Sequence, residues 1–265
     1  MSEARTTLAT LLQTLAPVAI AVSGGIDSLT LASFAHRALG RGHATMHHAT
    51  SPAVPAEATQ RTRDLAARQG WTLDIFDAGE FADPNYRANP VNRCFFCKTN
   101  LYGAIAARTQ RQILSGTNTD DLGEYRPGLD AARAHGVRHP FVEAGFDKPA
   151  IRRLAAELGL GTLASLPAAP CLASRVETGI RIEGPVLALV HAMENLVAAA
   201  LSPATIRCRI RRAGIVIELD APTLARLTPH NRETLTARIS ELATGGGDTQ
   251  ISFAAYRTGS AFLHA

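Results

Sequence analysis

The chain has 265 residues, of which 46% are hydrophobic and 19% are charged, and its formal net charge is +4. This length and composition favour two domains with a buried core and exclude a disordered protein, while the charge is too small to indicate nucleic-acid binding by itself. No segment approaches the roughly 18–20 apolar residues that span a bilayer, and the N-terminus lacks a signal-peptide pattern, so we expect a soluble, cytoplasmic protein.

Strand-like and helix-like segments alternate over the first two thirds of the chain. In chain order they predict a strand at 17–22, a helix at 29–39, a strand at 43–50, a helix at 55–69, a strand at 72–76, a helix at 95–108, a strand at 111–114 and a helix at 147–158. This alternation predicts an α/β domain, in which a Rossmann-like parallel sheet carries helices on both faces. Ligands bind such sheets at the carboxyl ends of the strands, so the loops after those ends form the functional edge.

The last third of the chain differs in composition. Residues 161–170 are rich in Gly, Ala, Ser and Pro. Beyond them the pattern predicts a helix at 186–201, strands at 206–210 and 215–219, a helix at 229–243 and a strand at 250–254. A hairpin accompanied by helices indicates a smaller α+β domain. We therefore expect one domain over residues 1–170 and a second over residues 171–265.

The segment SGGIDS at residues 23–28 follows the first predicted strand and precedes a helix. Two glycines, Gly24 and Gly25, allow a tight turn with exposed backbone amides, and the helix adds the positive end of its dipole, which suits a phosphate group. The hydroxyls of Ser23 and Ser28 are donors, and Asp27 is a candidate ligand for Mg²⁺. The segment matches neither G-x-x-x-x-G-K-[ST] nor G-x-G-x-x-G. An ordinary capped strand-to-helix turn is the alternative.

The four cysteines are Cys94, Cys97, Cys171 and Cys208, in a chain that is neither small nor visibly secreted. Cys94 and Cys97 form a C-x-x-C pair at the start of a predicted helix, where thiolates are favoured. Such a pair with a distant third cysteine indicates a metal, an iron–sulfur cluster or sulfur chemistry. Cys208 falls on the apolar side of a predicted strand, and we expect it to pack in the core.

Residues 23–28 resemble the PP-loop of the ATP-pyrophosphatase superfamily, whose members cleave ATP to AMP and pyrophosphate. Further segments are similar to those of the LarE-type ATP-dependent sacrificial sulfur transferases, so that the resemblance covers nearly the whole chain. They lie at residues 92–98, 116–128, 170–175 and 256–260. The resemblance implies a PP-loop domain followed by a smaller domain for substrate binding and oligomerisation.

The resemblance also implies an activity. Members of this family use ATP and Mg²⁺ to adenylate a carboxylate of pyridinium-3,5-biscarboxylic acid mononucleotide, and then replace oxygen by sulfur, in the biosynthesis of the nickel-pincer nucleotide cofactor. The residues that the resemblance assigns to ATP are Ser23, Gly24, Gly25, Asp27, Ser28, Gly116 and Thr117.

Two subgroups of this family obtain sulfur differently. In one, the cysteine that matches Cys171 gives up its own sulfur. In the other, three cysteines hold a 4Fe–4S cluster that carries an additional sulfur, and Cys94, Cys97 and Cys171 match this second pattern. Three cysteine ligands leave one iron open. The residues alone leave as alternatives a consumed Cys171 with spectator cysteines, a zinc site, and a disulfide between Cys94 and Cys97.

Arginines in the second predicted domain are candidates for substrate binding. Arg207, Arg209 and Arg211 alternate along a predicted strand, which places them on one face, and guanidinium groups suit a phosphate or carboxylate. The resemblance assigns Arg207 and Arg209 to the mononucleotide, with a solvated strand face as the alternative. Arg175, four residues after Cys171, is a further candidate, with a surface salt bridge as the alternative.

The remaining polar residues give weaker signals. We expect His47 and His48 to pack within a predicted strand. Lys98 and Lys148 are candidate partners for the charge on the departing phosphates.

Two other functions fit parts of the pattern. Some tRNA thiolases combine a PP-loop with a C-x-x-C pair and a cluster, but the small charge and few aromatic residues predict no RNA-binding surface. A non-catalytic nucleotide-sensing metal or iron–sulfur protein is the other alternative. For the favoured function we expect a small-molecule mononucleotide as substrate, a homo-oligomer, no membrane partner, and a sulfur donor that the sequence does not identify.

Overall fold

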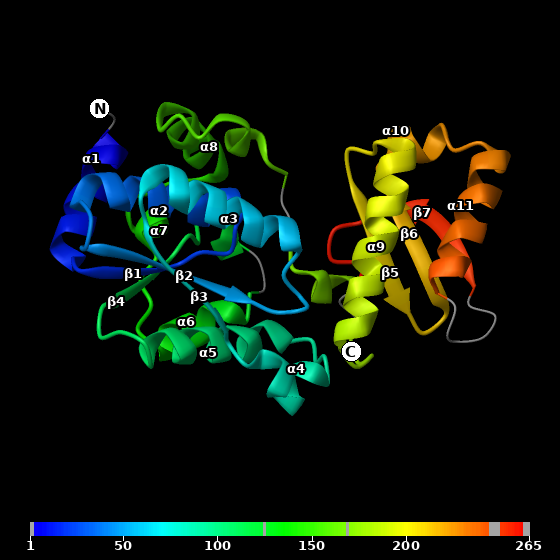
Figure 1. The fold of residues 1–265 in the computed structure, drawn as a ribbon, viewed down its shortest axis with the longest axis horizontal. Helices are drawn as coiled ribbons and strands as arrows, with labels where there is room; N and C mark the ends of the chain where they lie inside the picture. Colours follow the sequence, from blue (N-terminus) through cyan, green and yellow to red (C-terminus); the bar gives the residue numbers. More distant parts are fainter. Residues whose placement is uncertain (1–2, 124–125, 168–169, 244–249, 262–265) are drawn as a thin grey trace. The chain divides into compact units, whose positions relative to one another are not determined.

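The computed structural model describes residues 3–123, 126–167, 170–243 and 250–261. The chain divides into two compact units, the first formed by Met1–Asp83 and Asn92–Ala169 and the second by Pro84–Val91 and Pro170–Ala265 (Figure 1). The first contains a four-stranded parallel sheet and the second a three-stranded sheet. The predicted α/β class, with a Rossmann-like sheet and a smaller sheet domain, is confirmed.

The sheet of the first unit brings two loops together. Its strands are β1 (Val18–Ala21), β2 (Ala44–Thr50), β3 (Thr72–Asp77) and β4 (Gln112–Ser115), in the order β3-β2-β1-β4. The chain moves outward from β1 through β2 to β3 and then returns to place β4 on the other side of β1. Strand order therefore reverses between β1 and β4, and the loops that follow these two strands border the crevice where α/β sheets bind ligands.

Helices cover both faces of this sheet, as Figure 1 shows. They are α1 (Glu3–Leu15), α2 (Ile26–Leu39), α3 (Ala56–Gln69), α5 (Arg93–Ala106), α6 (Gly128–Ala134), α7 (Pro140–Glu143) and α8 (Lys148–Glu157). Successive residues of β1 point to opposite faces, so Val18 and Ile20 join the core under α1, α2 and α8, while Ala19 and Ala21 join the core under α5 and α6. A strand that is buried on both faces must be apolar throughout, which is why VAIA reads as a continuous apolar run.

Local signals mark the end of α3 and the start of α8 at the residues that the sequence predicts. Gly70 follows α3 in the left-handed conformation with φ 69°, and its N–H donates to Ala66 O. Asp147 precedes α8, and its carboxylate accepts a hydrogen bond from the N–H of Ala150 at 2.7 Å.

His48 ties β2 to two neighbouring elements. Its Nδ1 lies 2.8 Å from Val22 O and its Nε2 lies 2.9 Å from the hydroxyl of Thr59 on α3. A carbonyl oxygen can only accept, so Nδ1 carries the proton and the neutral ring accepts from Thr59 through Nε2. The side chain is fully buried, in agreement with the packing role predicted for it.

The second unit is a small sheet covered by helices. Its elements are α4 (Pro84–Arg87), α9 (Gly184–Leu201), β5 (Ile206–Arg211), β6 (Gly214–Leu219), α10 (Ala221–Ala225), α11 (Pro229–Leu242) and β7 (Ile251–Ala255). Strands β5 and β6 form the predicted antiparallel hairpin, and β7 pairs parallel to β6. Helix α9 packs on β5, where the thiol of Cys208 lies 3.6 Å from the sulfur of Met193. Cys208 is fully buried, as predicted.

The segment Pro84–Val91 belongs to the second unit, whereas the expected division at residue 170 assigns it to the first. Buried Asn89 explains the difference. Its side-chain amide donates to Glu177 O at 2.8 Å and to Ile180 O at 2.9 Å, and its own carbonyl accepts from the N–H of Gly179. These bonds join the segment to a loop about 90 residues away in sequence, which composition along the chain cannot reveal.

Among the described residues, α9 is the one helix that is long and apolar enough to cross a membrane by length and composition. This corrects the expectation that no segment approaches that length. The helix carries Glu194, which is buried and bonded to Arg175, and its other buried side chains include Leu187, Met193 and Val197. In this structure it is therefore a packing element of the second unit.

We predict that the first unit loses stability as the pH falls below about 6.5. Burial lowers the pKa of His47, His48 and His139 below the ordinary value of 6.5, so the unfolded chain binds more protons than the folded chain under acidic conditions. This contribution is complete above pH 6.5 and decreases as the pH falls from 6.5 toward the lowered values. Urea denaturation followed by circular dichroism between pH 8 and pH 5.5 measures it.

The matched variants are His48→Gln and His230→Gln. His230 is exposed on α11, so its replacement should leave the pH dependence of the unfolding midpoint unchanged. His48→Gln should make that dependence shallower, and an unchanged slope in this variant would contradict the prediction.

Candidate functional site

The loop between β1 and α2 is closed by its own serines. The hydroxyl of Ser28 donates to Gly25 O at 3.1 Å, lies 3.1 Å from the hydroxyl of Ser23 and accepts from the N–H of Ser23 at 3.0 Å. Gly24 has a φ of +78°, and a Cβ on it would lie 2.5 Å from Ala58 O. Only glycine fits this position. Helix α2 begins directly afterwards, so the N–H groups of its first turn have no acceptor within the helix.

The loop after β4 lies directly against this first loop. A Cβ on Gly116 would lie 2.8 Å from the backbone nitrogen of Ser28 and 2.9 Å from the carbonyl carbon of Asp27. The two backbones approach this closely only because position 116 has no side chain. The structure thus brings the segment 23–28 next to the segment 116–117, about 90 positions later in the chain. Both segments contain predicted ATP-binding residues.

A chain of hydrogen bonds supports the second loop. The hydroxyl of Thr117 lies 3.0 Å from that of Ser115, which in turn lies 2.8 Å from Nδ1 of His139. Burial lowers the pKa of His139, so the ring is neutral near pH 7. Sequence analysis identified neither Ser115 nor His139, because this contact joins the end of β4 to the residue before α7. Of the predicted motif at 116–128, residues 124 and 125 lie outside the described part.

Asp27 forms an ion pair across the site. Both of its carboxylate oxygens lie 2.6 Å from Nζ of Lys148, the first residue of α8, and the N–H of Lys148 donates to the carboxylate of Asp120 at 2.9 Å. Burial raises the pKa of Asp27, and Lys148 opposes that rise. The residue expected to bind Mg²⁺ is therefore paired with Lys148 in this structure. That Lys148 interacts with the departing phosphates stays a prediction.

Three of the four cysteines have accessible thiols. Cys94 and Cys97 lie half-buried in the first turn of α5 in the first unit, and Cys171 is exposed before the short 3₁₀ helix Leu172–Arg175 in the second unit. None of the three forms a disulfide. Cys94 and Cys97 share a helix face because they are three residues apart. Within the described ranges, no three His, Cys, Asp or Glu side chains are grouped so as to hold a metal ion.

Two of the three arginines assigned to the substrate are held in buried ion pairs. The guanidinium of Arg175 forms two hydrogen bonds to the carboxylate of Glu194, at 2.9 and 3.0 Å, and also donates to the carbonyl of Cys171. Arg209 donates to Glu218 at 2.8 Å and to the carbonyl of Ser174. Both side chains are about 5% exposed, so Arg209 does not lie on a solvated strand face and the ion pair of Arg175 is not at the surface. Contact of either arginine with the substrate stays a prediction.

Glu218 is the centre of this second network. Its other carboxylate oxygen accepts from Arg211 at 3.0 Å and from the hydroxyl of Ser260 at 2.6 Å. Arg207 differs from these arginines, since it is half-buried with its guanidinium 5.6 Å from the centre of the Tyr256 ring. Burial lowers its pKa. Its guanidinium also donates to the carbonyl of Ile206 at 2.6 Å, and its role in binding the substrate stays a prediction.

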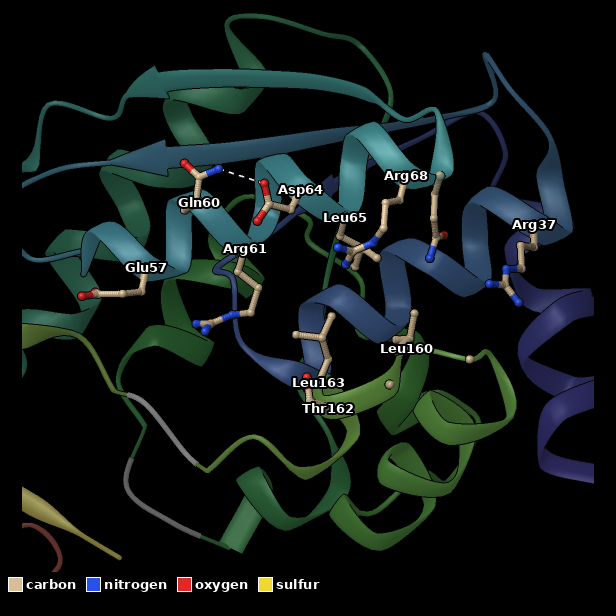
Figure 2. A pocket seen from close by; sticks show the side chains of 13 residues that line it. Arg37, Glu57, Gln60, Arg61, Asp64, Leu65, Arg68, Leu160, Thr162 and Leu163 are labelled. Carbon is tan, nitrogen blue, oxygen red and sulfur yellow. Dashed lines mark hydrogen bonds between the residues drawn. The ribbon is translucent and has the colours of Figure 1, made fainter. Parts of the chain in front are cut away.

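A cavity of about 730 Å³ lies beside the site in the first unit (Figure 2). It is bordered by α2, by α3 and by the turn after α8. Three arginines line it, Arg37, Arg61 and Arg68, and Nε of Arg61 donates to the carbonyl of Gly24 at 2.8 Å. Sequence analysis did not identify this cavity, because its walls come from three separate segments of the chain.

The chain is similar to several known proteins. It is 38% identical over 167 residues to an uncharacterised protein of Synechocystis sp., with 62% of each chain covered. It is 31% identical over 224 residues to pyridinium-3,5-bisthiocarboxylic acid mononucleotide synthase of Lactiplantibacillus plantarum, which covers 81% of this chain and 79% of that protein. A protein of Methanocaldococcus jannaschii is 29% identical over 136 residues. The matches to the Synechocystis and Methanocaldococcus proteins span 62% and 52% of their lengths. No protein-family model matches the chain.

We predict that Glu218→Gln destabilises the second unit by on the order of 3–5 kcal/mol, because it leaves the charge of buried Arg209 without its carboxylate. Urea denaturation measures the loss. Glu183→Gln is the control: Glu183 also bridges two arginines, Arg87 and Arg181, but it is exposed, so its removal should change the midpoint little. Equal midpoints for the two variants would show that burial of the network does not stabilise the unit.

Proposed function

The chain belongs to the family of pyridinium-3,5-bisthiocarboxylic acid mononucleotide synthase, and on this premise we propose that it is an ATP-dependent sulfur transferase. Its proposed substrate is pyridinium-3,5-biscarboxylic acid mononucleotide, in which sulfur replaces an oxygen of a carboxylate, toward the nickel-pincer nucleotide cofactor. The observation that carries the proposal is the match to the Lactiplantibacillus plantarum synthase over 81% of the chain. The close approach of the loops after β1 and β4 supports it.

The first step of the proposal is adenylation. A carboxylate oxygen of the substrate attacks the α-phosphorus of ATP, the bond to the β-phosphate oxygen breaks, and pyrophosphate leaves. The loop at residues 23–28 would hold the departing pyrophosphate, because the amides of a glycine turn and of a helix N-terminus together bind phosphate oxygens. The close contact of Gly116 with Ser28 supports this role, since it fixes the backbone that would make those bonds.

Lys148 and Asp27 would serve the same step. A carboxylate is the ligand type that Mg²⁺ prefers, and Asp27 would hold the ion once Lys148 pairs with phosphate oxygens instead of with Asp27. Bound Mg²⁺ would stabilise negative charge on the leaving pyrophosphate. The position of Asp27 in the loop, within reach of Lys148, supports the proposal.

The second step transfers sulfur. A sulfur nucleophile attacks the adenylated carboxyl carbon, and AMP leaves with the electron pair of the broken C–O bond. Cys94, Cys97 and Cys171 would together hold a 4Fe–4S cluster, which when bound would supply a replaceable sulfur. None of these three cysteines forms a disulfide or is buried as Cys208 is, and this supports the proposed donor set. Arg207 would contact the phosphate of the mononucleotide.

We predict that Gly116→Ala abolishes pyrophosphate release, because its new methyl group would press against the backbone of Ser28. Gly103→Ala is the control, since a Cβ there meets its nearest neighbour at an ordinary 3.7 Å and alanine favours the helix. Pyrophosphate is measured with ATP, Mg²⁺ and the biscarboxylic mononucleotide. Release that requires tRNA would indicate a thiolase of RNA, and a parental protein that releases none would indicate a non-catalytic nucleotide sensor.

A further prediction separates the two sources of sulfur. If the three cysteines hold a cluster, Cys94→Ser, Cys97→Ser and Cys171→Ser each lose the brown absorbance and sulfur transfer together, and Cys208→Ala retains both. If Cys171 is consumed instead, its thiolate sulfur is lost and each turnover lowers the protein mass by about 34 Da. Anaerobic absorbance spectra and intact mass spectrometry after turnover make the comparison. The lighter species together with an active Cys94→Ser variant would overturn the cluster.

A further inference from the structure

Helix α3 contacts the β1–α2 loop at Gly24, whereas Gly116 contacts it at Asp27 and Ser28. Ala58 O lies against Gly24, and Thr59 fixes His48, whose Nδ1 donates to Val22 O. Arg61 completes this contact, because its Nε donates to Gly24 O at 2.8 Å. One helix thus fixes two carbonyl groups of the loop, those of Val22 and Gly24.

The bond from Arg61 determines which way one peptide group faces. In a trans peptide the C=O and the following N–H point in opposite directions. With Gly24 O turned toward Arg61, the N–H of Gly25 is turned toward the hydroxyl of Ser23, at a long 3.4 Å. That N–H therefore faces the inner side of the loop, where phosphate oxygens would be received.

The backbone alone does not fix the orientation of the Gly24–Gly25 peptide group. It joins two glycines, and glycine adopts positive and negative φ with similar ease, so the chain allows the Gly24–Gly25 peptide to rotate. A partner on its carbonyl is needed to keep one orientation. Arg61 supplies that partner with a charged donor, and hydrogen bonds from charged groups are about twice as strong as those between neutral groups.

Arg61 is itself held in place. Glu57 lies one turn earlier on α3 and interacts with the Arg61 charge, and the side chain of Arg61 borders the cavity seen in Figure 2. Arg68 borders the same cavity two turns further along α3. These two arginines share a helix and a cavity, and the hydrogen bond to Gly24 O comes from Arg61.

We propose that Arg61 is a positioning residue of the nucleotide site: it holds the Gly24–Gly25 peptide with its N–H directed at the pyrophosphate portion of ATP. The inference rests on the proposed function, because it assumes that residues 23–28 bind phosphate. Arg61 acts through the backbone of the loop. Replacing Arg61 should weaken the binding of ligands that carry a pyrophosphate group and leave the binding of ligands without one unchanged.

The test measures the binding of three probes, ATP, inorganic pyrophosphate and AMP, each with Mg²⁺, by isothermal titration calorimetry on the full chain. In Arg61→Gln we expect the affinity for ATP and pyrophosphate to fall by roughly 10- to 100-fold, the usual value of a hydrogen bond to a charged group, with AMP affinity unchanged. Arg61→Lys should restore part of the loss. Arg68→Gln should bind all three probes as the parent does.

The outcomes distinguish a failure of the role of Arg61 from a failure of the proposed function. Parental affinity for pyrophosphate in Arg61→Gln overturns the role of Arg61, while the phosphate-binding loop stands. Equal losses for AMP and pyrophosphate also overturn it, because they indicate general damage to the unit. A parental protein that binds neither ATP nor pyrophosphate overturns the proposed function itself and the inference with it.

Discussion

Two backbone contacts without an intervening side chain determine the site of the first unit. At Gly24 the loop lies on the carbonyl of Ala58, and at Gly116 the following loop lies on the backbone of Ser28. A methyl group at either position would come within 3 Å of main-chain atoms, which cannot move aside as a flexible side chain can. Because both contacts use the main chain, they fix how closely the two loops and α3 approach one another at these points. Such preorganisation is what a site needs to stabilise charge as it develops.

The second unit depends instead on buried charge. Glu194 and Glu218 lie within its core, and each is satisfied by an arginine that makes several hydrogen bonds. A buried carboxylate is tolerated only when its partners are complete, so these arginines are fixed by the needs of the fold. A planar guanidinium carries five donors, so it can pair with both oxygens of a carboxylate and still bond to backbone carbonyls. Arg207 differs from them in being half-buried, with its guanidinium beside the Tyr256 ring.

The pattern of the sequence predicted the strands of both sheets and most of the long helices, but not α1, α4, α6, α7 or α10. Continuous apolar runs such as residues 18–21 required strands buried on both faces, and alternation with helices required a parallel sheet. The two glycines of the SGGIDS segment favour a tight turn independently of the rest of the chain. The arginines of β5 were predicted on the correct strand, but their partners were not, because the partner of Arg209 lies nine residues away across a hairpin.

The sequence by itself therefore determined what depends on neighbouring residues: the period of each element, the glycines of the loop, the helix ends at Gly70 and Asp147, and the C-x-x-C turn. Tertiary structure alone decided which side chains meet. Lys148 reaches Asp27 across 121 positions, Arg61 reaches Gly24 across 37, and Asn89 draws its segment into the second unit. The physical reason is that local propensity acts within a few residues, whereas ion pairs and backbone contacts form only once the sheet has brought distant loops to one edge.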